Sequence, residues 1–78
     1  MNRTMTPYAN RSGSSGIRAY EIRDTSIVVE FRHGGKYVYN YEMPGREEVE
    51  EMKRLADLGA GLATYINKTV RKRFAAKR

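Results

Sequence analysis

Residues 26–41 decide the fold of this chain, and they read Ser26-Ile-Val-Val-Glu-Phe-Arg-His-Gly-Gly-Lys-Tyr-Val-Tyr-Asn-Tyr41. Two alternating runs of β-branched and aromatic residues flank a glycine pair, a pattern typical of a β-hairpin. A two-residue turn at Gly34 and Gly35 would place the tyrosines on the face opposite to Phe31. We favour a three-residue loop over 33–35, with Gly35 in the left-handed conformation, because it places them on the same face.

The three-residue loop pairs Phe31 with Tyr37 and gathers the large apolar side chains on one face of the hairpin. These side chains are Ile27, Val29, Phe31, Tyr37, Tyr39 and Tyr41. We expect this face to form the core, so that most of the tyrosines are buried. If the face were open instead, Tyr37 and Tyr39 would be secondary candidates for stacking against a nucleic-acid base.

A further strand is predicted over Ile17–Ile22, and a two-residue turn after it would pair Ile22 with Ile27. The expected sheet is therefore a three-stranded antiparallel β-meander with residues 26–31 in the middle. Residues 1–16 contain a Ser-Gly run and several other polar residues, which predicts a flexible N-terminal leader.

The sequence changes to a helical period after Pro44 and Gly45. Residues 46–58 place apolar side chains at helical spacing and crowd glutamates into the first turns, which favours a helix there. A second helix is predicted over 62–74, because Leu62, Ile66, Val70 and Phe74 recur every four residues. The predicted fold is α+β, with two C-terminal α-helices packed on one face of the sheet.

These elements form a single domain over residues 17–74, and residues 75–78 are expected to be a basic C-terminal tail. The chain has 78 residues, no cysteine and one histidine, His33. No phosphate-binding glycine loop or acid/base pair is present, so we expect neither an enzyme nor a metal site nor a cofactor. No apolar run is long enough for a membrane span, and we expect a cytoplasmic protein.

The positive charge is concentrated at the C-terminal end. The formal net charge is +6, and residues 68–78 carry six cations and no acid. They are Lys68, Arg71, Lys72, Arg73, Lys77 and Arg78. On the predicted second helix, Tyr65 would share the outward face with several of them. This combination predicts a binding site for nucleic acid, RNA or another single strand, with phosphates on the cations and a base on Tyr65.

The order of these motifs resembles the KTSC family, short bacterial domains that also form a C-terminal extension of some lysyl-tRNA synthetases. The resemblance covers residues 15–74 and rests on Val29-Glu-Phe31, the glycine turn, Tyr37-Val-Tyr39 and the ending Asn67-Lys-Thr-Val-Arg-Lys-Arg-Phe74. That ending is similar to the family pattern Asn-x-x-Ile-Arg-x-x-Tyr. The resemblance implies a small stand-alone domain, and its synthetase context implies RNA as the ligand.

A second function class stays open from the sequence. The predicted edge strands, Ile17–Ile22 and 36–41, would offer unpaired backbone to another chain. A small core also gains stability by association. The alternative is therefore a protein-interaction or homo-oligomeric module.

Overall fold

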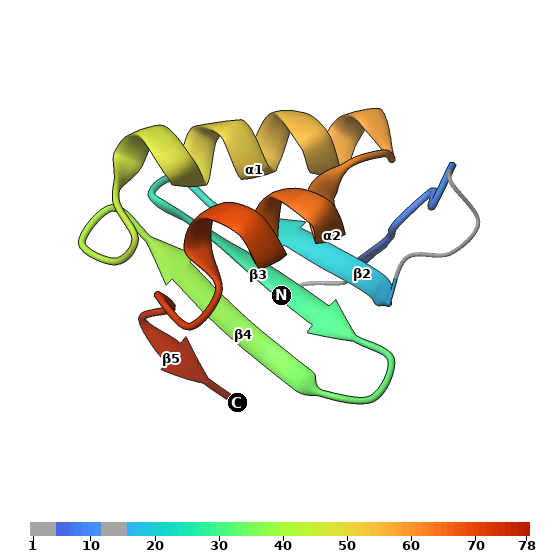
Figure 1. Ribbon diagram of the computed structural model, residues 1–78, viewed down its shortest axis with the longest axis horizontal. Helices are drawn as coiled ribbons and strands as arrows, with labels where there is room; N and C mark the ends of the chain where they lie inside the picture. The colour runs from blue at the N-terminus through green and yellow to red at the C-terminus, as the bar shows by residue number, and fades with distance from the viewer. Residues whose placement is uncertain (1–4, 12–15) are drawn as a thin grey trace.

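The computed structural model describes residues 5–11 and 16–78. The sheet is antiparallel and has five strands in the order β1-β2-β3-β4-β5. The helices lie on one of its faces, as Figure 1 shows. The elements are β1 (Thr6–Pro7), β2 (Ile17–Ile22), β3 (Ser26–Phe31), β4 (Gly35–Asn40), α1 (Arg46–Leu58), α2 (Leu62–Tyr65), the π-helical turn η1 (Ile66–Val70) and β5 (Ala76–Lys77). The α+β class, the antiparallel sheet and the two helices are confirmed.

The first hairpin has the predicted register. Ile22 pairs with Ile27 and Tyr20 with Val29, and the Arg23 amide closes the turn. A bulge between Ile17 and Ala19 shifts the register near the start of β2. Tyr20, Ile27 and Val29 consequently face the helices together.

The β3–β4 loop has three residues, but it spans 32–34 rather than the predicted 33–35. Phe31 pairs with Gly35, and Val29 pairs with Tyr37. The predicted pair between Phe31 and Tyr37 is therefore wrong by two positions. A register shift of two residues leaves every side chain on the same face of the sheet, so the predicted assignment of side chains to faces is still correct. Gly35 has the expected left-handed backbone, with φ of 82°.

The prediction of a three-stranded sheet is wrong, because β1 and β5 extend it at both edges. Thr6 pairs with Tyr20 across β1 and β2, and Lys77 pairs with Tyr37 across β5 and β4. Figure 1 shows β5 lying beside β4 near the C-terminus. Each added strand has only two residues, and so short a segment carries no alternating pattern that a sequence reading can detect.

Helix α1 has the predicted bounds. Its first turn holds Glu47 and Glu48, which interact favourably with the helix dipole, and Gly59 ends it in the left-handed conformation with φ of 79°. A Cβ on Gly59 would lie 2.5 Å from the Cβ of Ala9. Both the backbone angle and this close approach therefore require glycine.

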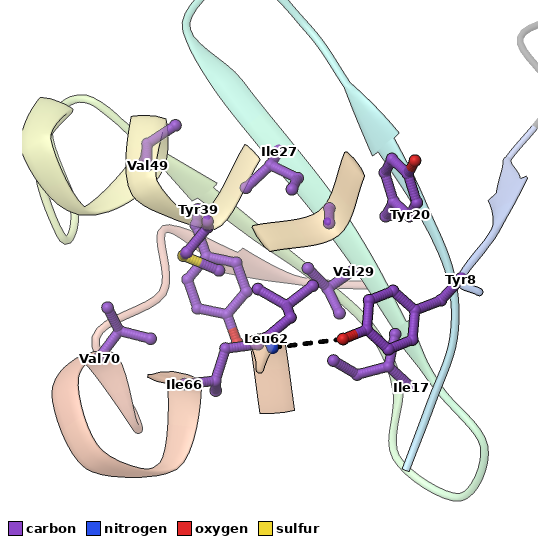
Figure 2. Close-up of a cluster of buried hydrophobic side chains, with 12 residues drawn as sticks. Tyr8, Ile17, Tyr20, Ile27, Val29, Tyr39, Val49, Leu62, Ile66 and Val70 are labelled. Carbon is purple, nitrogen blue, oxygen red and sulfur yellow. Dashed lines mark hydrogen bonds between the residues drawn. The ribbon is translucent and has the colours of Figure 1, made fainter. Parts of the chain in front are cut away.

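The core lies between the helices and the sheet, and Figure 2 shows its side chains. Tyr8 belongs to it, because its ring is buried and its hydroxyl accepts a hydrogen bond of 3.3 Å from the Leu62 amide. Part of the predicted leader, 6–8, is thus folded against the domain. The remainder of that prediction over 1–4 and 12–15 lies outside the described residues.

The second helix ends earlier than predicted. Helix α2 passes into η1, which ends at Val70, so the helical conformation does not reach Phe74. The chain reverses at Arg71, and residues 76 and 77 of the predicted tail form β5. Among the described residues, no helix is long and apolar enough to cross a membrane.

Candidate nucleic-acid interface

A pocket of about 520 Å³ opens between the β3–β4 hairpin and the segment that follows η1. We call it the C-terminal pocket. Its lining residues are Gly16, Phe31, His33, Gly34, Tyr37, Tyr39, Ile66, Asn67, Arg71, Lys72 and Phe74. Within the described part of the chain, this lining contains no carboxylate. The pocket therefore combines aromatic rings with positive charge.

Three aromatic rings form one wall of the pocket. The ring of Tyr37 packs edge-to-face against Phe31 at 5.5 Å and against Phe74 at 4.7 Å between centroids. All three residues are partly buried, and all three line the pocket. Such rings offer an apolar surface on which a planar ligand can pack.

Three cations surround these rings. Arg71 and Lys72 line the pocket and are exposed. Lys77, in β5, places its Nζ 5.4 Å from the centroid of the Tyr37 ring. At this distance the ammonium group is attracted by the π-face of the ring, which holds it near the pocket. Positive charge and aromatic surface consequently lie on the same side of the sheet.

The end of η1 builds the pocket. The Arg71 amide donates to the Ile66 carbonyl at 2.6 Å, the hydrogen bond that closes the π turn. Arg71 then has φ of 38° and ψ of −108°, and the Arg73 amide donates to the Val70 carbonyl at 2.6 Å. These features match a type II′ turn with Arg71 as its first central residue. The reversal brings Phe74 back onto the sheet and allows β5 to pair with β4.

Two of the predicted site residues lie beside the acidic helix instead of the pocket. Burial and the nearby carboxylates of Glu48 and Glu51 raise the pKa of Tyr65. Arg73 donates to the Pro44 carbonyl at 3.0 Å and lies 3.8 Å from Glu48. The carboxylates would repel a phosphate near Tyr65, so this region is poorly suited to the role that the sequence predicts for it.

Lys68 and Arg78 are exposed but do not line the pocket. The backbone of Arg78 exchanges two hydrogen bonds with Lys36, which extends the ladder beyond β5. Because side chains alternate along a strand, Arg78 points to the face opposite to Lys77. The six predicted cations therefore do not form one surface. Only Arg71 and Lys72 line the pocket, and Lys77 lies beside it through its contact with the Tyr37 ring.

The secondary candidates Tyr37 and Tyr39 differ in exposure. Tyr39 is 1% exposed and lies in the core, and its burial, with a smaller effect of Tyr37, raises its pKa to about 12. Tyr37 is partly exposed at the pocket. The expectation that the tyrosines are mostly core thus holds for Tyr39, whereas Tyr37 remains accessible to a ligand.

Sequence reasoning did not assign Phe31, His33, Asn67 or Phe74 to the site. His33 and Phe31 belong to the β3–β4 hairpin, whereas Asn67 and Phe74 come from η1 and the segment after it. Phe74 was expected to be the last contact of a helix, and the turn at Arg71 instead carries its ring to Tyr37. The positive φ of a non-glycine residue leaves no signal in the sequence, so this arrangement required the structure.

No family model, no curated protein and no solved structure matches this chain. The resemblance to the KTSC family therefore stays a prediction that rests on the residues alone. In the described residues, no group of three or more metal-ligating side chains could hold an ion.

Proposed function

We propose that this chain binds single-stranded nucleic acid, RNA above all, through the C-terminal pocket. The observation that carries the proposal is the meeting of partly exposed rings and cations at one site without a carboxylate in its lining. Aromatic stacking and phosphate neutralisation are the two interactions by which proteins bind single strands with little dependence on sequence.

The aromatic rings and the cations of the C-terminal pocket would bind different parts of the strand. An unpaired base packs on the exposed surface of Tyr37 and Phe74, where stacking contributes about 1–3 kcal/mol per base. Arg71, Lys72 and Lys77 bind the phosphates that flank this base. A duplex keeps its bases stacked inside the helix, so it offers only its phosphates. The binding mode therefore favours a single strand over a duplex.

Charge reversal at two of the cations tests whether they bind the phosphates. We expect the double variant Lys72→Glu, Lys77→Glu to bind a labelled single-stranded RNA about tenfold more weakly, or worse, in fluorescence anisotropy at low salt. Both side chains are exposed, and the contact of Lys77 with the Tyr37 ring contributes at most about 1 kcal/mol at such a site. Circular dichroism should therefore match that of the parent, and the melting temperature should fall only slightly. Arg71 is kept unchanged in this variant, because its backbone also shapes the turn.

The matched control is the double variant Lys68→Glu, Arg54→Glu. It makes the same change in net charge at two exposed positions that do not line the pocket and that, unlike Lys77, have no described contact with its aromatic rings. Arg54 contacts Glu51 at 2.6 Å, and a surface ion pair of this kind contributes at most about 1 kcal/mol. Equal loss of binding in both double variants would contradict a local site and would reduce the interaction to net charge alone.

The homo-oligomeric alternative has less support from the sheet edges. The amide of Lys36 donates to Arg78, that of Asn40 donates to Met43, and the Val38 carbonyl accepts from Ala75. The outer edge of β4 is thus occupied by the chain itself, and pairing with another chain there would require that segment to leave. Light scattering coupled to size-exclusion chromatography would favour this alternative if it found a dimer that does not respond to nucleic acid.

A further inference from the structure

Arg71 occupies a backbone position that favours glycine. Its φ of 38° and ψ of −108° place it at the first central position of a type II′ turn, where Gly, Asn and Asp predominate. A bulky side chain in this region is strained, and such residues persist where the surrounding structure holds them, often at ligand sites. The chain nevertheless has an arginine there, and this residue lines the pocket.

The π turn that ends at Arg71 is a second sign of a ligand site. The amide of the strained residue, Arg71, also donates the hydrogen bond to Ile66 that closes the π turn, and π turns occur frequently at functional sites. Asn67 lies within this turn and also lines the pocket, and His33 reaches it from the opposite hairpin. Three residues with hydrogen-bonding side chains, Arg71, Asn67 and His33, thus line one cavity.

We propose that the C-terminal pocket is a site for one nucleotide, with Arg71 as its phosphate anchor. This inference rests on the proposed function and makes it specific. The base lies against Tyr37 and Phe74, and the phosphate attached to it meets the forked N–H donors of Arg71, which suit phosphate oxygens. The volume of about 520 Å³ lies within the range of about 300–1,000 Å³ of small-molecule sites.

The polar groups of the lining suit the edge of a base. Asn67 offers an amide donor and an acceptor, and His33 offers a ring nitrogen of each kind when it is neutral. Both side chains are exposed, so they are available to a ligand in the pocket. Because these groups supply both donors and acceptors, we expect a base to bind more tightly than an aromatic ring without hydrogen-bonding groups.

The first experiment titrates the ¹⁵N-labelled protein with AMP and UMP and, separately, with adenosine and with inorganic phosphate. We expect AMP to shift the amides of 33–37 and 66–74 while those of α1 stay in place. Adenosine or phosphate alone should bind at least about tenfold more weakly than AMP, because each lacks one half of the contacts. Shifts that are scattered over the surface, or none at millimolar AMP, would overturn the inference.

The second experiment separates the side chain of Arg71 from its backbone. Arg71→Gly and Arg71→Ala both remove the guanidinium, and we expect each to weaken AMP binding about 10-fold to 100-fold. Glycine relieves the strain whereas alanine does not, so Arg71→Gly should melt about 4–8 °C above Arg71→Ala. Unchanged AMP affinity in the well-folded Arg71→Gly protein would contradict the anchor role.

A phosphate joined to a base occurs both in a free nucleotide and in a nucleic-acid strand, and competition distinguishes these sources. Displacement of AMP by a short single-stranded RNA supports a nucleic-acid ligand in the pocket. AMP binding that the RNA does not displace supports the nucleotide site and contradicts the proposed function. Salt-dependent RNA binding that shifts the pocket amides but is unaffected by Arg71→Gly, in a protein that does not bind AMP, overturns the nucleotide site alone. RNA binding that leaves the pocket amides unshifted contradicts both proposals.

Discussion

Lys77 Nζ lies 5.4 Å from the ring centroid of Tyr37, and the two residues are also direct partners across β5 and β4. This pair joins the last strand of the sheet to the aromatic wall of the C-terminal pocket. The ring of Phe74 packs on the same tyrosine at 4.7 Å. The segment after η1 therefore stabilises the fold and carries the proposed binding site, and the two roles can be separated by substitution.

Replacement of Tyr37 tests both roles of its ring. Because the ring is only partly buried, we expect Tyr37→Ala to lower the free energy of unfolding by about 2 kcal/mol, less than a fully buried aromatic would. RNA binding should weaken as well, because a stacking surface is lost. Urea denaturation and anisotropy measure the two effects. Tyr37→Phe is the control and should retain both, and a Tyr37→Ala protein with parental RNA affinity would exclude stacking on this ring.

Loss of the Phe74 ring should release β5. The ring contacts Tyr37 and, at 6.5 Å, Tyr39, so Phe74→Ala removes the main aromatic contact of the C-terminal segment. We expect faster hydrogen exchange at the amides of Lys36 and Arg78, whose mutual hydrogen bonds hold the segment on β4. The amide of Val49 in α1 should keep its protection. Uniform acceleration across the protein would show global destabilisation instead.

Tyr8 anchors the N-terminal segment through a buried hydrogen bond. Tyr8→Phe leaves the Leu62 amide without its acceptor, and we expect a loss of about 1–3 kcal/mol in the free energy of unfolding. Tyr20→Phe also removes a tyrosine hydroxyl, but this hydroxyl donates to Asp57, which is exposed. The loss in the free energy of unfolding should therefore be smaller. Chemical denaturation of the two variants gives the comparison. An equal cost in both would contradict a special role for Tyr8.

The buried hydroxyl of Tyr39 predicts a loss of stability at high pH. Burial raises its pKa to about 12 from an ordinary value of 10, so the unfolded state loses this proton first. The stabilisation is complete below pH 10 and is lost as the pH rises through 12, at about 3 kcal/mol for the full change. We expect Tyr39→Phe to show a shallower decline in denaturation midpoint over this interval, and a decline as steep as in the parent would contradict the assignment.

Much of the sheet and the whole of α1 could be predicted, because local chemistry determines them. The turn after Ile22 sets the first register, and the glutamates and Gly59 set the bounds of α1. The β3–β4 register was two positions in error, since the glycine pair allows more than one loop of the same length. The assignment of side chains to the two faces of the sheet was nevertheless correct, because side chains alternate with a period of two.

The candidate site was predictable only in part. Basic composition indicated Arg71, Lys72 and Lys77, but it indicated Lys68, Arg73 and Arg78 equally. Which of them meet the aromatic rings depends on the strained turn at Arg71 and on the pairing of β5, neither of which follows from periodicity or composition. Tyr65 shows the same limit, since the carboxylates beside it come from a different helix.

The salt dependence of RNA binding tests the central claim most directly. The parent protein is titrated into a labelled single-stranded RNA, and into a duplex of the same length, at several concentrations of monovalent salt. Three phosphate contacts, one each for Arg71, Lys72 and Lys77, predict a slope of about −2 for the logarithm of the association constant against the logarithm of salt concentration. We expect that slope together with tighter binding of the single strand. No saturable binding of the single strand at low salt, or equal binding of the duplex, would contradict the account.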